Sequence, residues 1–358
     1  MDYVELMEQA RPRLGANCKG CLICNGRACG NKMPGPGAKG IGDTAIRNYE
    51  KWKEIRINMD TLVERKPVDM SLDFFGKRLK YPIIAGPVGL VAVHYSDAYT
   101  DTTYNDVLVS GCAAEGIVAM TGDGADATVM QAACGAIKKA GGLGIPTVKP
   151  WGPETLQEKF ACVKDSGAFA CAMDVDGAGL PFLKKLNTSA GSKSEEELAE
   201  IIRNAGVPFI VKGIMTVKGA LKAKAAGAAG IVVSNHGGRV LDQCPATAEV
   251  LPEIVDAVQG EMKVLVDGGI RSGVDIFKAL AIGADAVIIA RPYVTAVYGA
   301  GAEGIRVLTQ KLAAELEDTM EMCGAHTLKE ITRDMVRLQE TNYSRKRNSQ
   351  ETKTQKFM

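Results

Sequence analysis

Four consecutive apolar runs in the second half of the chain each end in a polar or cationic side chain, and this pattern constrains the fold most. The runs cover residues 207–211, 230–233, 264–266 and 286–290, and each has the length and the branched residues of a buried strand. The first run is followed by Lys212. A barrel of parallel strands gathers such strand ends at one face, where barrel enzymes build their active sites. The pattern therefore predicts an α/β fold of the (β/α)8 barrel class.

Four further apolar runs upstream complete the count of eight strands. They cover residues 82–85, 117–120, 145–148 and 169–175. A barrel of this class takes about 250 residues, and the chain has 358. We therefore expect a Cys-rich extension and lead-in over residues 1–50, the barrel over residues 51–340, and a disordered basic tail over residues 341–358.

A phosphate site is predicted at the ends of the last two strands. Gly268 and Gly269 follow Asp267 directly, and their small size lets backbone N–H groups approach a phosphate closely. Arg271 and Arg291 can add charge-assisted hydrogen bonds. We read this group as an anchor for the phosphate of a nucleotide.

The segment SNHGGR at residues 234–239 supplies candidate catalytic groups. The ordinary pKa of a histidine lies near neutrality, so His236 is a candidate general base. Arg239 follows three residues later, and its planar guanidinium can bind a carboxylate through two hydrogen bonds. The two residues together predict chemistry on a small carboxylic acid.

These motifs make residues 207–335 resemble the FMN-dependent 2-hydroxy-acid oxidase and dehydrogenase family, which includes glycolate oxidase and lactate oxidase. The similarity extends more weakly back to about residue 35. The motifs that carry it are VKG at 211–213, SNHGGR at 234–239, DGGIR at 267–271, FKAL at 277–280, GADA at 283–286 and Arg291-Pro292. The resemblance implies FMN-dependent oxidation of a small, lactate-like L-2-hydroxy acid to the 2-oxo acid.

The resemblance also implies a role for individual residues. His236 would remove a proton, Arg239 would hold the substrate carboxylate, and Asp176 would stabilise the protonated imidazole. Lys212 would lie near N1 and O2 of the flavin, and a hydride equivalent would pass to flavin N5. The residues expected around FMN are Pro87, Val88, Gly89, Thr121, Gly122, Lys149, Asp174, Lys212, Ser234, Asp267, Gly268, Gly269, Arg271, Ala290 and Arg291.

The chain departs from the family pattern at several substrate and flavin positions. Lys149 and Trp151 stand where the family has a flavin-binding glutamine and a substrate-binding tyrosine, and Met33-Pro34 replaces another tyrosine. Residues 177–182 lack the family's second arginine. We expect Trp151, together with His236 and Arg239, to contact substrate.

Because of these departures, other functions stay open. One alternative is a flavin oxidoreductase acting on a larger amine, peptide or cofactor precursor. Another is a flavin-dependent isomerase, although His236 with Arg239 argues against it. A third is a non-catalytic flavin-binding or metal-binding protein.

Four of the ten cysteines lie close together near the start of the chain. Cys18, Cys21, Cys24 and Cys29 have the local density expected of ligands to zinc or to an iron–sulfur cluster. Reduced structural thiols or redox-active thiols are the alternatives. Conventional members of the family lack this segment, so the resemblance does not name a metal.

Charge and hydropathy give the remaining expectations. The net charge is +1, which favours neither nucleic acid nor a membrane surface as a partner. No apolar run is long enough to span a membrane and the first residues lack an apolar signal, so we expect a cytoplasmic protein. The resemblance implies a homo-oligomer, often a tetramer. Oxygen, a quinone and another protein all remain possible electron acceptors.

Overall fold

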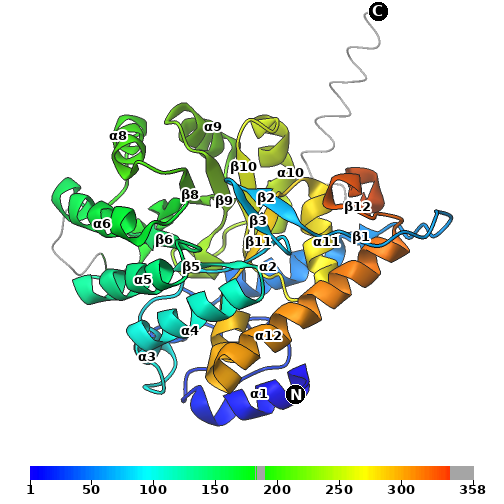
Figure 1. The fold of residues 1–358 in the computed structure, drawn as a ribbon, viewed down its shortest axis with the longest axis horizontal. Helices are drawn as coiled ribbons and strands as arrows, with labels where there is room; N and C mark the ends of the chain where they lie inside the picture. Colours follow the sequence, from blue (N-terminus) through cyan, green and yellow to red (C-terminus); the bar gives the residue numbers. More distant parts are fainter. Residues whose placement is uncertain (182, 184–189, 339–358) are drawn as a thin grey trace, which may run out of the picture.

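Eight parallel strands close into a barrel and confirm the predicted fold class (Figure 1). The computed structural model describes residues 1–181, 183 and 190–338. Around the barrel the strands follow the order β10-β11-β4-β5-β6-β7-β8-β9. Their bounds are β4 Ile83–Ala85, β5 Val118–Thr121, β6 Ile145–Val148, β7 Cys171–Asp174, β8 Phe209–Ile214, β9 Gly230–Val233, β10 Lys263–Val266 and β11 Ala286–Ile289.

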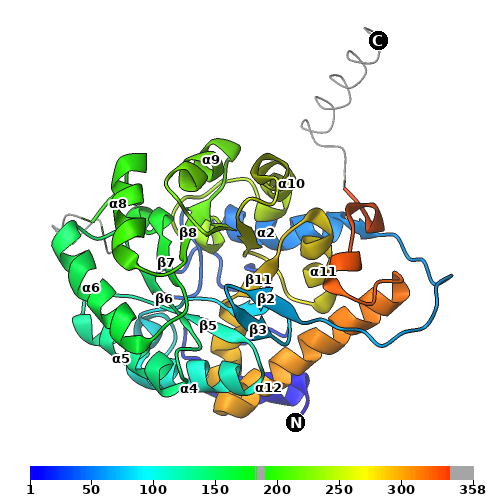
Figure 2. The same cartoon turned by 45° about the horizontal axis from the view of Figure 1, so that its top comes forward.

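Helices surround the barrel, and Figure 2 shows the ring that they form outside the strands. The largest departure from a regular alternation is α12, which is interrupted at Ala300 and Gly301 by non-helical backbone. The helices of the ring are α3 Val91–His94, α4 Asp101–Ala114, α5 Ala127–Lys139, α6 Pro153–Ser166, α8 Glu195–Ala205, α9 Val217–Ala225, α10 Thr247–Val258, α11 Gly273–Ile282 and α12 Arg291–Met322.

Alternation along the strands divides the buried side chains between two cores. In β4, Ile84 belongs to the core inside the barrel, whereas Ile83 and Ala85 pack in the core between strands and helices. Successive side chains of a strand point to opposite faces, which explains the division. The inner core also includes Phe74 and Leu79 of the hairpin formed by β2 Leu72–Phe74 and β3 Lys77–Leu79. This hairpin packs at the barrel end where the strands begin.

The N-terminal part of the chain packs against the barrel. Helix α1 (Tyr3–Ala10) lies beside α12 in Figure 1, and the short 3-10 helix η1 (Arg11–Arg13) follows it. Residues 14–42 then run without helix or strand to α2 (Asp43–Glu54). The predicted boundary after residue 50 falls inside α2, and the division of the chain into parts stays a prediction.

The last described elements lead back to the segment that precedes the barrel. Strand β12 (Val336–Arg337) pairs with β1 (Arg56–Ile57), after the 3-10 helices η4 (Leu328–Glu330) and η5 (Arg333–Met335). The predicted disordered tail at residues 341–358 lies outside the described residues. Within the described part of the chain, no helix has both the length and the apolar character needed to cross a membrane.

Candidate active site

A cavity of about 380 Å³ opens where the barrel strands end. Residues in or after β4, β5, β6, β8, β9, β10 and β11 contribute to it, as expected for the side of a barrel that carries function. Fourteen of the predicted site residues line it: Pro87, Val88, Gly89, Gly122, Lys149, Lys212, His236, Arg239, Asp267, Gly268, Gly269, Arg271, Ala290 and Arg291. The other residues predicted to bind FMN or substrate or to act in catalysis do not line it: Thr121, Trp151, Asp174, Asp176 and Ser234.

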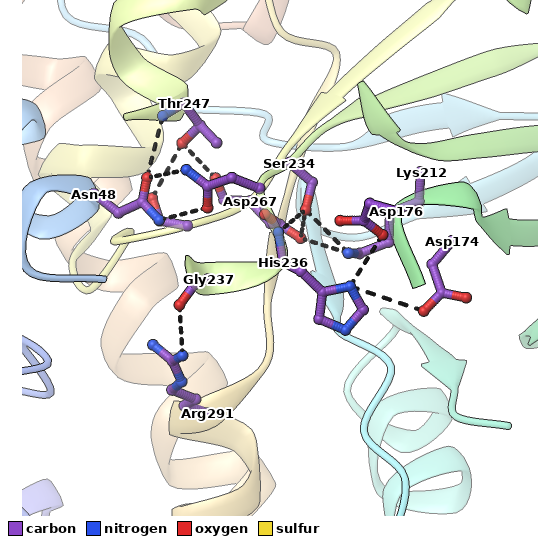
Figure 3. A network of polar contacts seen from close by, with 12 residues as sticks. Asn48, Asp174, Asp176, Lys212, Ser234, His236, Gly237, Thr247, Asp267 and Arg291 are labelled. Atoms are coloured by element: carbon purple, nitrogen blue, oxygen red, sulfur yellow. Dashed lines mark hydrogen bonds and ion pairs between the residues drawn. The ribbon is translucent and has the colours of Figure 1, made fainter. Parts of the chain in front are cut away.

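His236 and Asp176 form a pair at the mouth of the barrel (Figure 3). Asp176 Oδ1 lies 3.0 Å from His236 Nδ1, and Asp174 Oδ2 lies 3.9 Å from the same nitrogen. Asp176 follows β7 in the 3-10 helix η2 (Val175–Gly179), whereas His236 follows β9 and adopts a left-handed backbone with φ of 56°. The pair therefore joins two strand ends and orients the imidazole toward the cavity.

Burial and charge set the protonation of this pair. Burial lowers the pKa of His236 below its ordinary value of 6.5, Asp176 opposes this shift, and Lys212 adds to it. Burial also opposes ionisation of Asp176, but His236 and Lys212 outweigh it and lower the pKa of Asp176. A neutral imidazole held by an ionised carboxylate results, which is the state that a general base needs.

Lys212 places a buried cation beside the pair. Its Nζ lies 3.0 Å from Ser234 Oγ and 3.4 Å from Asp267 Oδ2, and Ser234 Oγ donates to Asp267 Oδ2 at 2.9 Å. Burial opposes the charge of Lys212, yet Asp267, Asp176 and Asp174 raise its pKa. The ammonium group is therefore permanently charged, and Ser234 acts through Lys212 and Asp267 rather than from the cavity wall.

A second buried ion pair lies at the end of β6. Lys149 Nζ contacts Asp174 Oδ2, and both side chains are almost fully buried. Lys149 lines the cavity and Asp174 does not. Among the described residues, Asp174, Asp176 and His236 are the only three side chains whose ligand atoms are close enough to share a metal ion. Because Lys149 and Lys212 already neutralise these carboxylates, we interpret the group as a base with its supports.

The predicted phosphate anchor is built on α2 as well as on the barrel. Trp52 Nε1 donates to Gly268 O at 2.8 Å, and a Cβ added at Gly269 would lie 2.0 Å from the carbonyl oxygen of Asn48. Arg291 Nη2 donates to Gly237 O at 2.8 Å. These contacts fix the glycines with positive φ against α2, so the loop after β10 keeps its backbone exposed to the cavity.

Asn48 was not among the predicted site residues, although it supports them. Its side chain and that of Asn235 exchange two hydrogen bonds, of 2.7 and 2.9 Å, and both are buried. Asn48 Oδ1 also accepts from the backbone nitrogen of Thr247 at 3.2 Å. A buried polar residue such as Asn48 in α2 can indicate a supporting role. The sequence did not indicate that α2 would lie against the end of β9, where the partner Asn235 is found.

Arg239 is held in place by the N-terminal segment. Its Nη1 donates to Gly35 O at 2.7 Å and to Gly37 O at 2.6 Å. Its Nη2 lies 3.3 Å from His94 Nε2, and His94 Nδ1 accepts from the backbone nitrogen of Gly35 at 3.1 Å. Burial and the charge of Arg239 lower the pKa of His94 to about 4. His94 is therefore a neutral support for Arg239, a role that its isolated position in the sequence did not reveal.

Trp151 is not placed where we expected a substrate contact. Its side chain is 4% exposed and does not line the cavity. Its Nε1 donates to Asp123 Oδ2 at 2.7 Å, and Asp123 Oδ1 accepts from Lys159 Nζ at 2.6 Å. The buried carboxylate of Asp123 needs donors and attracts the indole nitrogen. The prediction that Trp151 faces the substrate is therefore wrong for this structure.

One of the four N-terminal cysteines, Cys24, contacts the predicted phosphate anchor. Arg271 Nε donates to Cys24 O at 2.7 Å, and Arg271 Nη2 lies 3.8 Å from Cys24 Sγ. All four thiols are partly buried and free of disulfides. Arg271 thus connects the cysteine segment with the cavity.

Unpaired polar atoms at the strand ends fit a bound FMN. Within the described part of the chain, seven buried side-chain polar atoms have no hydrogen-bond partner, and five of them belong to residues at the barrel mouth. Buried polar atoms normally have partners, so this concentration indicates groups that await a polar ligand. The five are Thr121 Oγ1, Thr147 Oγ1, Asp174 Oδ1, Asp176 Oδ2 and Asp267 Oδ1.

One side of the cavity is formed by the turn after β4. A Cβ added at Gly122 would lie 2.5 Å from the backbone carbonyl of Val88. The turn after β4 therefore packs directly on the end of β5, and Pro87, Val88 and Gly89 form part of the cavity wall. Lys212, Arg271 and Arg291 line the same cavity.

Comparison with known proteins agrees with this geometry. The sequence profile of the family described as FMN-dependent dehydrogenase matches residues 36–181 and 172–338. The chain is 50% identical to a peroxisomal (S)-2-hydroxyacid oxidase of Arabidopsis thaliana over 131 residues, which are 37% of the chain and 36% of that relative's length. It is 31% identical to an L-lactate oxidase of Lactobacillus jensenii over 76% of the chain and 72% of that protein.

A solved structure also resembles the fold. A mandelate oxidase variant in complex with (S)-mandelic acid superposes with a TM-score of 0.76 and 26% sequence identity. The superposition covers 93% of the chain and 97% of that protein.

Proposed function

The chain belongs to the FMN-dependent dehydrogenase family, and from this premise we propose that it uses FMN to oxidise a small, lactate-like L-2-hydroxy acid to the 2-oxo acid. The observation that carries the proposal is the His236–Asp176 pair at the cavity, with Lys212 and Arg239 as cations beside it. Base, carboxylate receptor and cation are the three groups that this oxidation requires.

FMN would be held at two places. Gly268, Gly269, Arg271 and Arg291 would bind its phosphate, and the wall at Pro87, Val88 and Gly89 would lie along its ring. The unpaired hydroxyls of Thr121 and Thr147 would bond the polar edge of the ring. When bound, FMN supplies an acceptor at N5 for the hydride equivalent.

The substrate would be bound and deprotonated by side chains of the barrel. Arg239 would bind its carboxylate and so place the hydroxyl-bearing carbon near His236. The neutral imidazole would accept the hydroxyl proton, and Asp176 would stabilise the resulting imidazolium through Nδ1. The charge of Lys212 favours negative charge on its neighbours and would support electron uptake at this place in the cavity.

A larger 2-hydroxy acid is the second candidate substrate, and one observation favours it. Trp151 is turned into the protein interior, and Met33 and Pro34 line the cavity where the family has a tyrosine. Two aromatic substrate contacts are therefore absent from the described cavity wall. This favours a pocket that also accepts longer or aromatic side chains.

Several properties beyond the reaction are part of the same proposal. We propose a homotetramer in the cytoplasm, with a barrel over residues 51–340 that follows a Cys-rich lead-in. The four cysteines are proposed to hold zinc or an iron–sulfur cluster, because they follow one another at the close spacing of metal ligands and are free of disulfides. Light scattering, cell fractionation and metal analysis test these three points.

Anaerobic bleaching of the bound flavin tests the reaction. Glycolate, L-lactate, longer 2-hydroxy acids and (S)-mandelate are added in turn to FMN-loaded protein, and the flavin absorbance is followed. We expect at least one of them to reduce the flavin, with 2-oxo acid formed in equal amount. Flavin-loaded protein that no member of this panel bleaches would contradict the proposal.

The base is tested with His236→Asn. Asparagine tolerates the left-handed backbone at this position better than alanine does, so the fold and FMN binding should persist. We expect flavin reduction to be abolished at unchanged FMN content. The matched control is His326→Asn, since His326 pairs with Glu330 after α12, outside the cavity.

A further inference from the structure

Residues 14–42 form a long segment without helix or strand between η1 and α2. Uninterrupted stretches of this length in a compact domain generally carry a function. This one contains all four closely spaced cysteines, and Gly20, Gly26 and Gly30 adopt positive φ between and after them. The backbone therefore turns repeatedly around the thiols.

The four cysteines lie within residues 18–29 of this segment, with two, two and four residues between them. All four thiols are partly buried and none forms a disulfide. Cys29 Sγ lies 3.7 Å from the carbonyl oxygen of Gly26, where the backbone turns with positive φ. Four free, partly buried thiols at this spacing are typical of a set of metal ligands rather than of scattered core residues.

The distances between the sulfurs distinguish the kinds of metal site. In tetrahedral zinc with four thiolates, bonds of about 2.3 Å place the sulfurs only ~3.8 Å apart. No three of these sulfurs lie within 4.8 Å of one another, although all four belong to the described residues. Thiolates that bind different irons of a cluster are spaced more widely. The run of cysteines at 18, 21 and 24, each separated by two residues, is also the spacing by which ferredoxin-type clusters are bound.

Two arginines contact the cysteine segment. Arg271 contacts both the carbonyl oxygen and the sulfur of Cys24. Arg11 Nε donates to Gly20 O at 3.1 Å, between Cys18 and Cys21. These guanidinium groups favour the net negative charge of a cluster over four neutral thiols.

We propose that Cys18, Cys21, Cys24 and Cys29 bind a [4Fe–4S] cluster that carries electrons out of the active site to a one-electron carrier protein. Arg271 lines the cavity and contacts Cys24, so one side chain would join a cluster held by Cys24 to the predicted phosphate position.

The electron-carrying role rests on the proposed function, whereas the cluster itself does not. Oxidation of one 2-hydroxy acid breaks its C–H and O–H bonds, forms the carbonyl, and releases two electrons and two protons. The cluster passes the electrons singly, two equivalents of the carrier are reduced, and the protons go to solvent. Oxygen is then not the required acceptor.

Metal analysis of the full-length chain purified without air tests the cluster. We expect about four irons and four acid-labile sulfides per chain, with an electron paramagnetic resonance signal after reduction by dithionite. One zinc per chain would overturn the proposal. So would a chain that takes up no iron on incubation with ferrous iron and sulfide.

Two cysteine variants test which thiols are involved. Cys21→Ser should lose the iron and the resonance signal and keep its FMN, because Cys21 does not line the cavity. Cys162→Ser is the matched control, since this partly buried thiol lies in α6. Iron retained at full level in Cys21→Ser, or lost equally in both variants, would contradict the assignment.

Cytochrome c tests the transfer of electrons. The native chain should reduce two equivalents of cytochrome c per 2-oxo acid formed, and Cys21→Ser should lose this activity while its flavin is still bleached by substrate. Unchanged cytochrome c reduction would overturn the electron-carrying role. Iron found in a chain whose flavin no substrate bleaches would refute the proposed function alone, and bleaching without iron would refute the cluster alone.

Discussion

In the proposed reaction His236 accepts a proton, and its surroundings determine whether it can. Burial keeps its pKa below 6.5, so the imidazole is neutral at physiological pH although a carboxylate contacts Nδ1. Asp176 limits the shift, because its charge favours the imidazolium. If His236 is the base, the balance between these two effects on its pKa sets the pH range of activity.

The pH dependence of kcat/KM should therefore rise from acid toward neutral pH. Protonated His236 cannot accept a proton, so activity is lost as pH falls through the pKa of His236, which lies below 6.5. Above that pH, the rate should be constant until another group titrates. Steady-state assays between about pH 4.5 and 8 measure the curve. A midpoint above 6.5 would contradict the assignment of His236 as the base.

A second residue-scale prediction concerns His94. His94→Ala removes the acceptor of the Gly35 backbone nitrogen and the neighbour of Arg239, and an unpaired buried donor costs about 1–3 kcal/mol. We expect KM for the 2-hydroxy acid to rise about tenfold, equivalent to about 1.4 kcal/mol, while the maximal rate of flavin reduction changes less. His326→Ala, assayed by the same stopped-flow method, should leave both constants unchanged. A normal KM in His94→Ala would show that Arg239 does not depend on this contact.

Individual residues were predictable from sequence where a motif carried them. His236, Arg239 and Asp267 line the cavity as the strand-end pattern predicted. The orientation of Trp151 was not predictable, because it depends on the buried charge of Asp123, which lies after another strand. His94 was not either, since its partners come from residues far away in the sequence.

At the scale of elements, the loop between β10 and α11 depends on its contact with α2. Gly269 has a φ of 82°, and a Cβ there would collide with the backbone of Asn48 at 2.0 Å. Asn48 and Trp52 hold α2 against this loop through hydrogen bonds to Asn235 and Gly268. The exposed backbone of the proposed phosphate anchor is therefore a property of two elements together.

Gly269→Ala should accordingly weaken FMN binding more than it weakens the fold. The added methyl group forces the loop away from α2, and we expect FMN affinity to fall at least about tenfold, by about 1.4 kcal/mol. Gly260→Ala is the matched control. Gly260 also has a positive φ, of 73°, but a Cβ there meets nothing within 4 Å, so only the backbone cost of about 1 kcal/mol remains. Fluorescence titration of FMN into each apoprotein compares them, and equal affinities would contradict the argument.

Strands and helices were predictable because their periodicity is local. The eight apolar runs became β4 to β11, with ends that moved by a few residues. The course of residues 14–42 was not predictable, because this segment has no repeating pattern and takes its shape from contacts with Arg239, Arg271 and the barrel.

At the scale of the whole molecule, the two ends of the barrel have separate tasks. The hairpin β2–β3 packs into the end where strands begin, and the cavity opens at the end where they finish. Such separation is general among barrel enzymes. This separation predicts that a substitution where the strands begin can lower the free energy of unfolding without changing the cavity where the strands end.

Phe74→Ala tests this separation. Phe74 is fully buried in the inner core, and removal of its ring should lower the free energy of unfolding by about 3–5 kcal/mol. FMN content and KM should stay at the native values below the melting temperature, because Phe74 does not line the cavity. Urea unfolding and flavin absorbance measure the two effects. Loss of FMN from folded Phe74→Ala would refute the separation.

The attachment of Arg239 and Arg271 to residues 14–42 has a practical consequence for handling the protein. One guanidinium rests on the carbonyls of Gly35 and Gly37, and the other on Cys24. A protease that cuts the chain within residues 14–42 leaves the eight barrel strands in place. The same cut removes the contacts that support Arg239 and Arg271. The absorbance of bound FMN and the oxidation of the 2-hydroxy acid should then be lost together, while the circular dichroism spectrum still shows native secondary structure.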